Sequence, residues 1–176
     1  ILPGGNFESL PHLQSNGWQH VKDDQADVKT GVELSLHAPR SGRSSLRMQC
    51  WPQEGVPVPL VLDHPPVVIS SGAVPVQAGQ IVRIHGWARV PQPVEATLDG
   101  LLIYDSAGGR DLAVRISEAE DWQEFTLFRA APRSGRLSLT FALCGFGEAW
   151  IDGVTITPLL HSTASPNASA ATPGIR

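Results

Sequence analysis

The residues best placed to do chemistry form one row on the longest predicted strand, residues 81–90. There, Arg83, His85, Trp87 and Arg89 alternate with smaller or apolar residues, so all four should share one outward face. A flat aromatic ring packs against the apolar face of a sugar ring, and long polar side chains beside it can bind the hydroxyl groups. The row therefore suits a hydroxyl-rich ring. The alternative is that Trp87 packs beneath a loop, with the arginine stems covering it.

Three further residues are candidates to join this row. Tyr104 and Arg115 lie on strands that we expect nearby. Trp51 begins the proline-rich segment 51–66, which should be a loop or edge segment because proline cannot donate to a strand ladder. From that loop, Trp51 would overhang the rim of the face.

Catalysis is not indicated. Asp63 and His64 are adjacent, but neighbours on an extended segment point to opposite sides. The sequence has no G-x-S-x-G, no H-E-x-x-H, no phosphate-binding glycine loop and no Cys/His cluster with zinc spacing. Glu118, Glu120 and Asp121 precede a strand and are typical of a solvated turn. We therefore expect no enzyme activity from this domain.

Composition excludes several classes of partner. The chain has 176 residues and a net charge of −4, with 17% charged residues, against about a quarter in typical domains. Because it lacks a basic stripe, we expect no nucleic-acid partner. Its apolar runs are too short for a membrane span. Residues 1–160 predict one folded domain, and the Ser/Ala/Pro-rich residues 161–176 predict a linker or disordered tail. The N-terminus has no signal-peptide pattern.

Short strands separated by glycine- and proline-rich turns account for most of the chain, and no stretch shows a sustained helical period. This pattern predicts an all-β fold, an antiparallel β-sandwich or jelly roll. The strands are expected at residues 18–21, 32–36, 45–50, 67–70, 81–90, 101–105, 112–116, 122–129, 136–143 and 149–156. Cys50 and Cys144 each lie near the end of a predicted strand. They could form a disulfide if those ends are neighbours, and two free thiols in the core are the alternative.

The last strand carries a slip in its apolar phase. Ile151 is odd-numbered, whereas Val154 and Ile156 are even-numbered. A slip across Asp152 and Gly153 predicts a β-bulge, which would place one carboxylate at a kink.

The order of several short motifs resembles the galactose-binding-like β-sandwiches, particularly carbohydrate-binding modules of the cellulose- and xylan-binding type. The motifs are Asn6-Phe7-Glu8, Gly17-Trp18, Ser41 to Leu46, Val76 to Gln80, Trp122 to Thr126, and Gly147 to Val154. The resemblance covers residues 6–158, and it implies a jelly-roll sandwich of the galactose-binding type.

The resemblance also implies roles for individual residues. Modules of this type often hold one structural calcium ion, and Glu8 and Asp152 match the acidic positions, with carbonyls of residues 41–45 as further ligands. The alternative is that Asp152 caps the bulge and Glu8 binds backbone amides. Trp18 and Trp122 match positions that are core aromatics in such modules.

The function implied by the resemblance is that of a non-catalytic carbohydrate-binding module, tethered to other domains of a larger extracytoplasmic or secreted protein. The alternative is a structural or protein-interaction sandwich with no sugar site. Exposure of Trp87 and Tyr104 in one groove would favour the first, and burial of both would favour the second.

Overall fold

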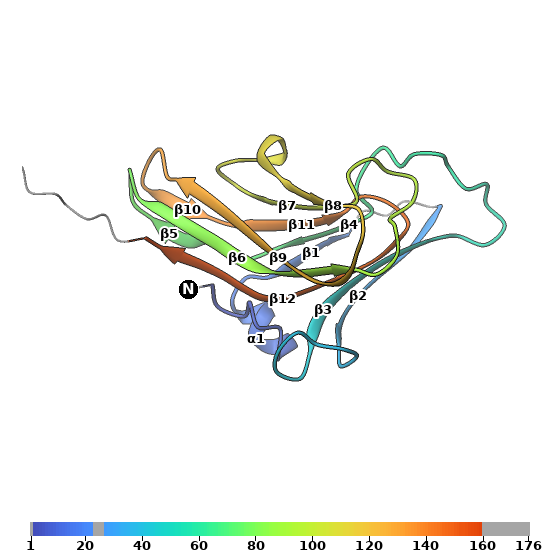
Figure 1. Cartoon of the computed structure of the whole chain (residues 1–176), viewed down its shortest axis with the longest axis horizontal. Helices are drawn as coiled ribbons and strands as arrows, with labels where there is room; N and C mark the ends of the chain where they lie inside the picture. The colour runs from blue at the N-terminus through green and yellow to red at the C-terminus, as the bar shows by residue number, and fades with distance from the viewer. Residues whose placement is uncertain (1, 23–26, 160–176) are drawn as a thin grey trace, which may run out of the picture.

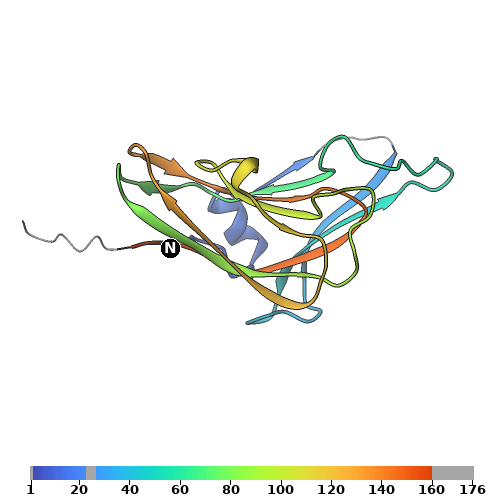
Figure 2. The ribbon, with the colours of Figure 1, turned by 45° about the horizontal axis from the view of Figure 1, so that its top comes forward.

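The computed structural model describes residues 2–22 and 27–159. The predicted linker, residues 161–176, lies outside this described part, as does residue 160. Every strand pairing within it is antiparallel, and ten of the strands form two sheets of five. Figure 1 and Figure 2 show these sheets as two facing layers. The predicted all-β sandwich is confirmed.

The two sheets differ in which parts of the chain they use. Sheet A has the order β1 (Gln19–Lys22), β4 (Val67–Ser70), β11 (Leu139–Leu143), β7 (Leu101–Asp105), β8 (Val114–Ile116). Sheet B has the order β2 (Val28–Ser35), β3 (Ser45–Pro52), β12 (Gly147–Pro158), β6 (Ile81–Val90), β9 (Ala119–Ala130). A separate pair, β5 (Val74–Val76) and β10 (Gly135–Leu137), lies at one end.

Most predicted strands are confirmed, and the differences have local causes. Strands β4, β6 and β7 have the predicted bounds. Strand β2 begins at Val28 instead of residue 32 because an edge strand tolerates polar residues while it pairs with β3. The predicted strand 136–143 is two strands, because Ser138 leaves the ladder to exchange hydrogen bonds with Ser106.

The predicted bulge in β12 is confirmed. Its register with β6 shifts between Asp152 and Thr155, and Gly153 adopts a φ of 60°, which favours glycine. The bulge brings Val154 and Ile156 into the core, as Ile151 is before it.

Aromatic rings fill part of the core between the sheets. Phe141 packs edge-on against Phe125 at 6.2 Å and lies parallel to Trp18 at 6.3 Å between ring centroids, and Trp18 also contacts Phe7. Such pairs contribute about 0.5–1.5 kcal/mol each beyond their buried area. The core role expected for Trp18 is confirmed. The core role expected for Trp122 is wrong: Phe125 faces the core, so Trp122, three residues earlier, faces outward and is only half-buried.

A short helix, α1 (Leu10–Ser15), was not predicted. Ser9 caps it, Pro11 lies in its first turn, and Leu13 alone is buried, in the same core. Six residues are too few for a helical period to show in the sequence. No helix of residues 2–22 and 27–159 is long and apolar enough to span a membrane.

The N-terminal segment fastens to β12 beside the bulge. The Val154 amide donates to the Gly5 carbonyl at 2.8 Å. A β-carbon at Gly5 would lie 2.0 Å from the Val154 carbonyl oxygen, so this close approach requires glycine. The Ser44 hydroxyl also donates to the Phe7 carbonyl, which ties the same segment to the β2–β3 connection.

The two cysteines are free and buried. Cys50 belongs to the core, whereas Cys144 belongs to a small cluster on the outer side of sheet A. Burial raises the pKa of Cys50 to about 12 and that of Cys144 to about 11. Both thiols are therefore protonated at neutral pH, and neither is an activated nucleophile.

Candidate functional site

Most of the tryptophans of the protein point outward from sheet B. Strand alternation directs Trp51 of β3, Trp87 of β6, Trp122 of β9 and Trp150 of β12 away from the core. These are four of the five tryptophans in the chain. We call this surface the outer face of sheet B. It combines flat rings with charged and amide side chains from neighbouring strands.

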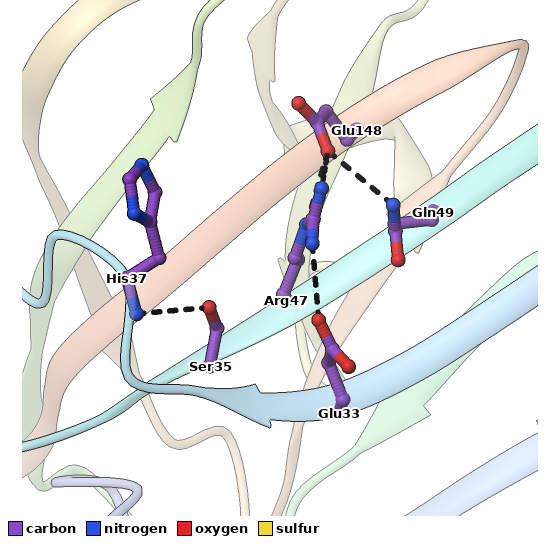
Figure 3. Close-up of polar contacts among 6 residues, drawn as sticks. All are labelled: Glu33, Ser35, His37, Arg47, Gln49 and Glu148. Carbon is purple, nitrogen blue, oxygen red and sulfur yellow. Dashed lines mark hydrogen bonds and ion pairs between the residues drawn. The ribbon is translucent and has the colours of Figure 1, made fainter.

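A charged cluster spans β2, β3 and β12 on this face (Figure 3). Arg47 donates to Glu148 from Nη2 at 2.5 Å and to Glu33 from Nη1 at 3.1 Å, and Gln49 donates to Glu148 at 3.4 Å. Desolvation lowers the pKa of Arg47, but hydrogen bonds to Glu148 and Glu33 outweigh it and raise that pKa. The cluster thus holds carboxylate and amide groups in fixed positions at the surface, as hydroxyl recognition requires.

The Trp150 ring lies beneath two arginines of the same face. The guanidinium carbon of Arg47 is 5.0 Å from the ring centroid, and that of Arg89 is 5.5 Å away. Register explains the arrangement, because Trp150 is paired with Arg47 on one side and Arg89 on the other. Trp150 is consequently buried, whereas Trp51 is 46% exposed.

The connection between β2 and β3, residues 36–44, folds over the other part of the face. Arg40 places its guanidinium carbon 4.2 Å from the centroid of Trp87, and the Trp122 indole donates to the Ala38 carbonyl at 3.3 Å. The Ser41 amide donates to Asp152 at 2.8 Å. We call residues 36–44 the covering turn, since it shields Trp87 while leaving Trp51 open.

The predicted row on β6 is confirmed as a row. Burial alternates along the strand, and Arg83, His85 and Trp87 share the outer face of sheet B. His85 lies 2.9 Å and Arg83 lies 3.5 Å from the Glu124 carboxylate of β9. Trp51 lies on the same face, although it belongs to β3 and not to the proline-rich loop.

The expectation that Tyr104 and Arg115 join this row is wrong. Both lie on sheet A, on β7 and β8, so the whole core separates them from Trp87. Arg115 binds Asp99 at 2.9 Å, and Tyr104 packs against the small apolar cluster on its own sheet. Trp87 and Tyr104 are each half-buried and share no groove, so neither of the two conditions set out above is met.

The two acidic residues expected to bind calcium both bind the covering turn. Asp152 accepts from the Ser41 amide at 2.8 Å and from the Gly153 amide at 2.6 Å, and Glu8 accepts from the Arg43 amide at 2.8 Å. Both carboxylates thus accept hydrogen bonds from backbone amides, as the alternative set out above described. Within the described ranges, no three His, Cys, Asp or Glu residues gather as a metal group.

Calcium at Glu8 and Asp152 stays a prediction with a direct check. If the ion binds, added calcium should raise the melting temperature relative to chelator. The free energy of unfolding should rise by about 2.7 kcal/mol when calcium is at a hundredfold excess over its Kd. This stabilisation should disappear in Glu8→Gln. An unchanged melting temperature would contradict the prediction.

Sequence reasoning missed the cluster of Glu33, Arg47, Gln49 and Glu148, and it missed Arg40. Alternation alone would have placed Arg47 and Gln49 outward on their strand. Their meeting with Glu33 and Glu148 depends on the register of three strands, which no local pattern states.

Comparison with known proteins supports the fold. No family model matches the chain, and no curated protein matches it by sequence. A CBM4 structure, where CBM stands for carbohydrate-binding module, matches 90% of this chain and 100% of its own at 14% identity, with a TM-score of 0.60.

Two further structures match over parts of longer chains. The enzymatically active domain of tailspike protein 4 of bacteriophage CBA120 matches 88% of this chain at 15% identity and a TM-score of 0.53, but this chain spans only 20% of its length. The CBM22-1-GH10 modules of a Clostridium thermocellum endo-1,4-β-D-xylanase, complexed with xylohexaose, match 86% of this chain and 28% of their own at 11% identity and a TM-score of 0.50. The chain therefore has the β-sandwich fold of carbohydrate-binding modules.

Proposed function

We propose that this chain is a non-catalytic carbohydrate-binding domain that contacts its polysaccharide with the outer face of sheet B. The observation that carries the proposal is the gathering of four of the five tryptophans on that face. Aromatic rings on an outer face can stack against the apolar side of sugar rings, and Trp51 is exposed to do so. The fold shared with carbohydrate-binding modules supports a sugar as that ligand.

The open part of the face is suited to bind first. Trp51 is 46% exposed and offers its ring to the apolar side of a sugar. Gln49 and Glu148, on β3 and the adjoining β12, present amide and carboxylate groups to sugar hydroxyls. A longer polysaccharide would also reach Trp87 once the Arg40 side chain moves away from that ring.

We further propose that the domain works outside the cytoplasm, joined to other domains of one polypeptide. Structural polysaccharides lie outside the cytoplasm, and a module without catalytic groups acts by holding a neighbouring domain near its substrate. The xylanase match, in which the similar module is part of a longer chain, supports this arrangement.

Affinity electrophoresis with soluble xylan, β-glucan and galactan tests the proposal. The wild-type protein should be retarded by at least one of these polysaccharides. Trp51→Ala should weaken binding by about ten- to a hundredfold, the loss expected when about 1.5–3 kcal/mol of ring burial is removed. Trp87→Ala should weaken only the binding of longer oligosaccharides, because Arg40 shields that ring from short ones.

Tyr104→Ala is the matched control, since it removes an outward aromatic residue from the opposite sheet. Binding should be unchanged in this variant. Loss of binding in Tyr104→Ala with no loss in Trp51→Ala would move the site to sheet A. No retardation by any of the three polysaccharides would refute the proposed polysaccharide face.

One observation favours a second function, that of a structural or protein-interaction sandwich. Guanidinium groups cover Trp87 and Trp150, as they would where arginine stems complete a hydrophobic surface. If polysaccharides fail to bind, the tryptophans of this face are explained by their packing against arginine side chains.

A further inference from the structure

A pocket of about 610 Å³ lies at one end of the sandwich, apart from the outer face of sheet B. Val76 of β5, Val82 of β6 and Leu137 of β10 are buried and form an apolar floor. The connection 131–134 between β9 and β10, the start of β10 and Ser106 after β7 form its walls. We call this the arginine pocket, because its polar lining is dominated by one residue type.

Three arginines line the arginine pocket, and no Asp or Glu does. Arg129 is already neutralised, since its Nε lies 2.6 Å from the buried Asp105 carboxylate. Arg133, on the connection between β9 and β10, and Arg136, on β10, are exposed, and neither forms an ion pair with any residue of the described ranges. In a chain of net charge −4, this is an uncompensated positive site above an apolar floor.

A second hollow of about 650 Å³ adjoins the first and shares Arg136 with it. Its lining is rich in hydroxyl and amide groups and again contains no acid; the polar side chains include Ser15, Asn16, Gln19, Ser70 and Ser138. Arg136 donates from Nη2 to the carbonyl of Ala73, a residue that lines the second hollow.

We infer that these two hollows form a binding site for an acidic oligosaccharide, with a uronic acid in the arginine pocket. The carboxylate of the uronic acid binds Arg133 and Arg136, and the apolar side of its ring rests on Val76 and Leu137. The next sugar places its hydroxyls among the serine and amide groups of the second hollow. The ligand class rests on the proposed carbohydrate function, but the residues of this site are not those of the outer face of sheet B.

The charge of the site sets its selectivity. A carboxylate between two arginines gains charge-assisted hydrogen bonds that a neutral sugar lacks, worth about ten- to a hundredfold in affinity. Both arginines are exposed, so this preference should decrease as salt is added.

Titration with digalacturonic acid, followed by calorimetry and by amide chemical shifts, tests the inference. Digalacturonic acid should bind at least tenfold more tightly than its neutral dimethyl ester, and the shifts should centre on residues 131–138. Arg133→Gln and Arg136→Gln should each weaken the acid about tenfold and leave the ester unchanged. Arg43→Gln is the matched control, because it removes an exposed arginine charge elsewhere.

Three outcomes would overturn the inference: equal affinity for acid and ester, equal loss in Arg43→Gln, or no binding of the acid at millimolar concentration. Trp51→Ala separates this site from the proposed polysaccharide face. Digalacturonate binding should persist in that variant, and its loss would place the acid on sheet B instead. If neutral polysaccharides fail to bind, the titration still reports on the arginine pocket alone.

Discussion

Replacing Asp152 with alanine should lower the free energy of unfolding by about 1–3 kcal/mol, the cost of leaving buried hydrogen-bond donors without their acceptor. Asp152 is fully buried at the bulge of β12 and accepts from the Ser41 and Gly153 amides. Without it, the Gly153 amide loses its partner and the covering turn loses its attachment. Urea unfolding measures the change, and Asp121→Ala, at an exposed position of β9, should change stability by less than about 0.5 kcal/mol. Equal effects of the two variants would contradict the role assigned to Asp152.

The same variant should show a characteristic dependence on pH in the presence of chelator. Burial raises the pKa of Asp152 above 3.8, although hydrogen bonds from Ser41 and Gly153 work against that rise. The folded protein therefore binds this proton more tightly than the unfolded chain does. Stability from Asp152 is fully present below 3.8 and declines as pH rises through the folded pKa. The stability difference between wild type and Asp152→Ala should accordingly shrink from acid to neutral pH, and growth of the difference would contradict the shift.

Replacing Arg129 with methionine should cost about 3–5 kcal/mol, because it leaves a buried carboxylate without its partner. Asp105 is fully buried, and its Oδ2 lies 2.6 Å from Arg129 Nε. Its other oxygen accepts from the Ala107 and Gly108 amides, so Asp105 cannot turn toward water without opening the turn after β7. Thermal or urea unfolding of the variant provides the measurement.

A double-mutant cycle separates the lost pair from the lost packing. Asp105→Asn removes the buried charge but keeps an oxygen for the turn amides, so the double variant with Arg129→Met should recover much of the stability. Arg83→Met is the matched control, because Arg83 and Glu124 form an exposed pair and its loss should cost less than about 1 kcal/mol. Equal losses in Arg129→Met and Arg83→Met would contradict a buried pair.

Much of the fold could be predicted because its signals are local. Alternation along residues 81–90 placed Arg83, His85 and Trp87 on one face, and the structure confirms it. The slip in apolar phase at Asp152 likewise predicted the bulge that the structure contains. Both predictions succeed because successive side chains of a strand point to opposite faces. The helix α1 was not predicted because six residues are too few to show a helical period in the sequence.

Much of the candidate site could not be predicted, because it depends on which strands become neighbours. Tyr104 follows the β6 row closely in the chain, yet its strand pairs with β11 in the opposite sheet. The meeting of Arg47 with Glu33 and Glu148 joins the consecutive strands β2 and β3 to β12, and Glu148 is 101 residues from Arg47 in the sequence.

The sequence by itself determined the β-sandwich, the outward row on β6 and the kink at Asp152, because strand period and turn chemistry act over a few residues. Only the tertiary structure decided that the covering turn shields Trp87, that Trp51 stays open, and that Arg133 and Arg136 face a hollow without acids. These features arise where the sheets and their connections pack together, and packing between distant segments leaves no periodic trace in the chain.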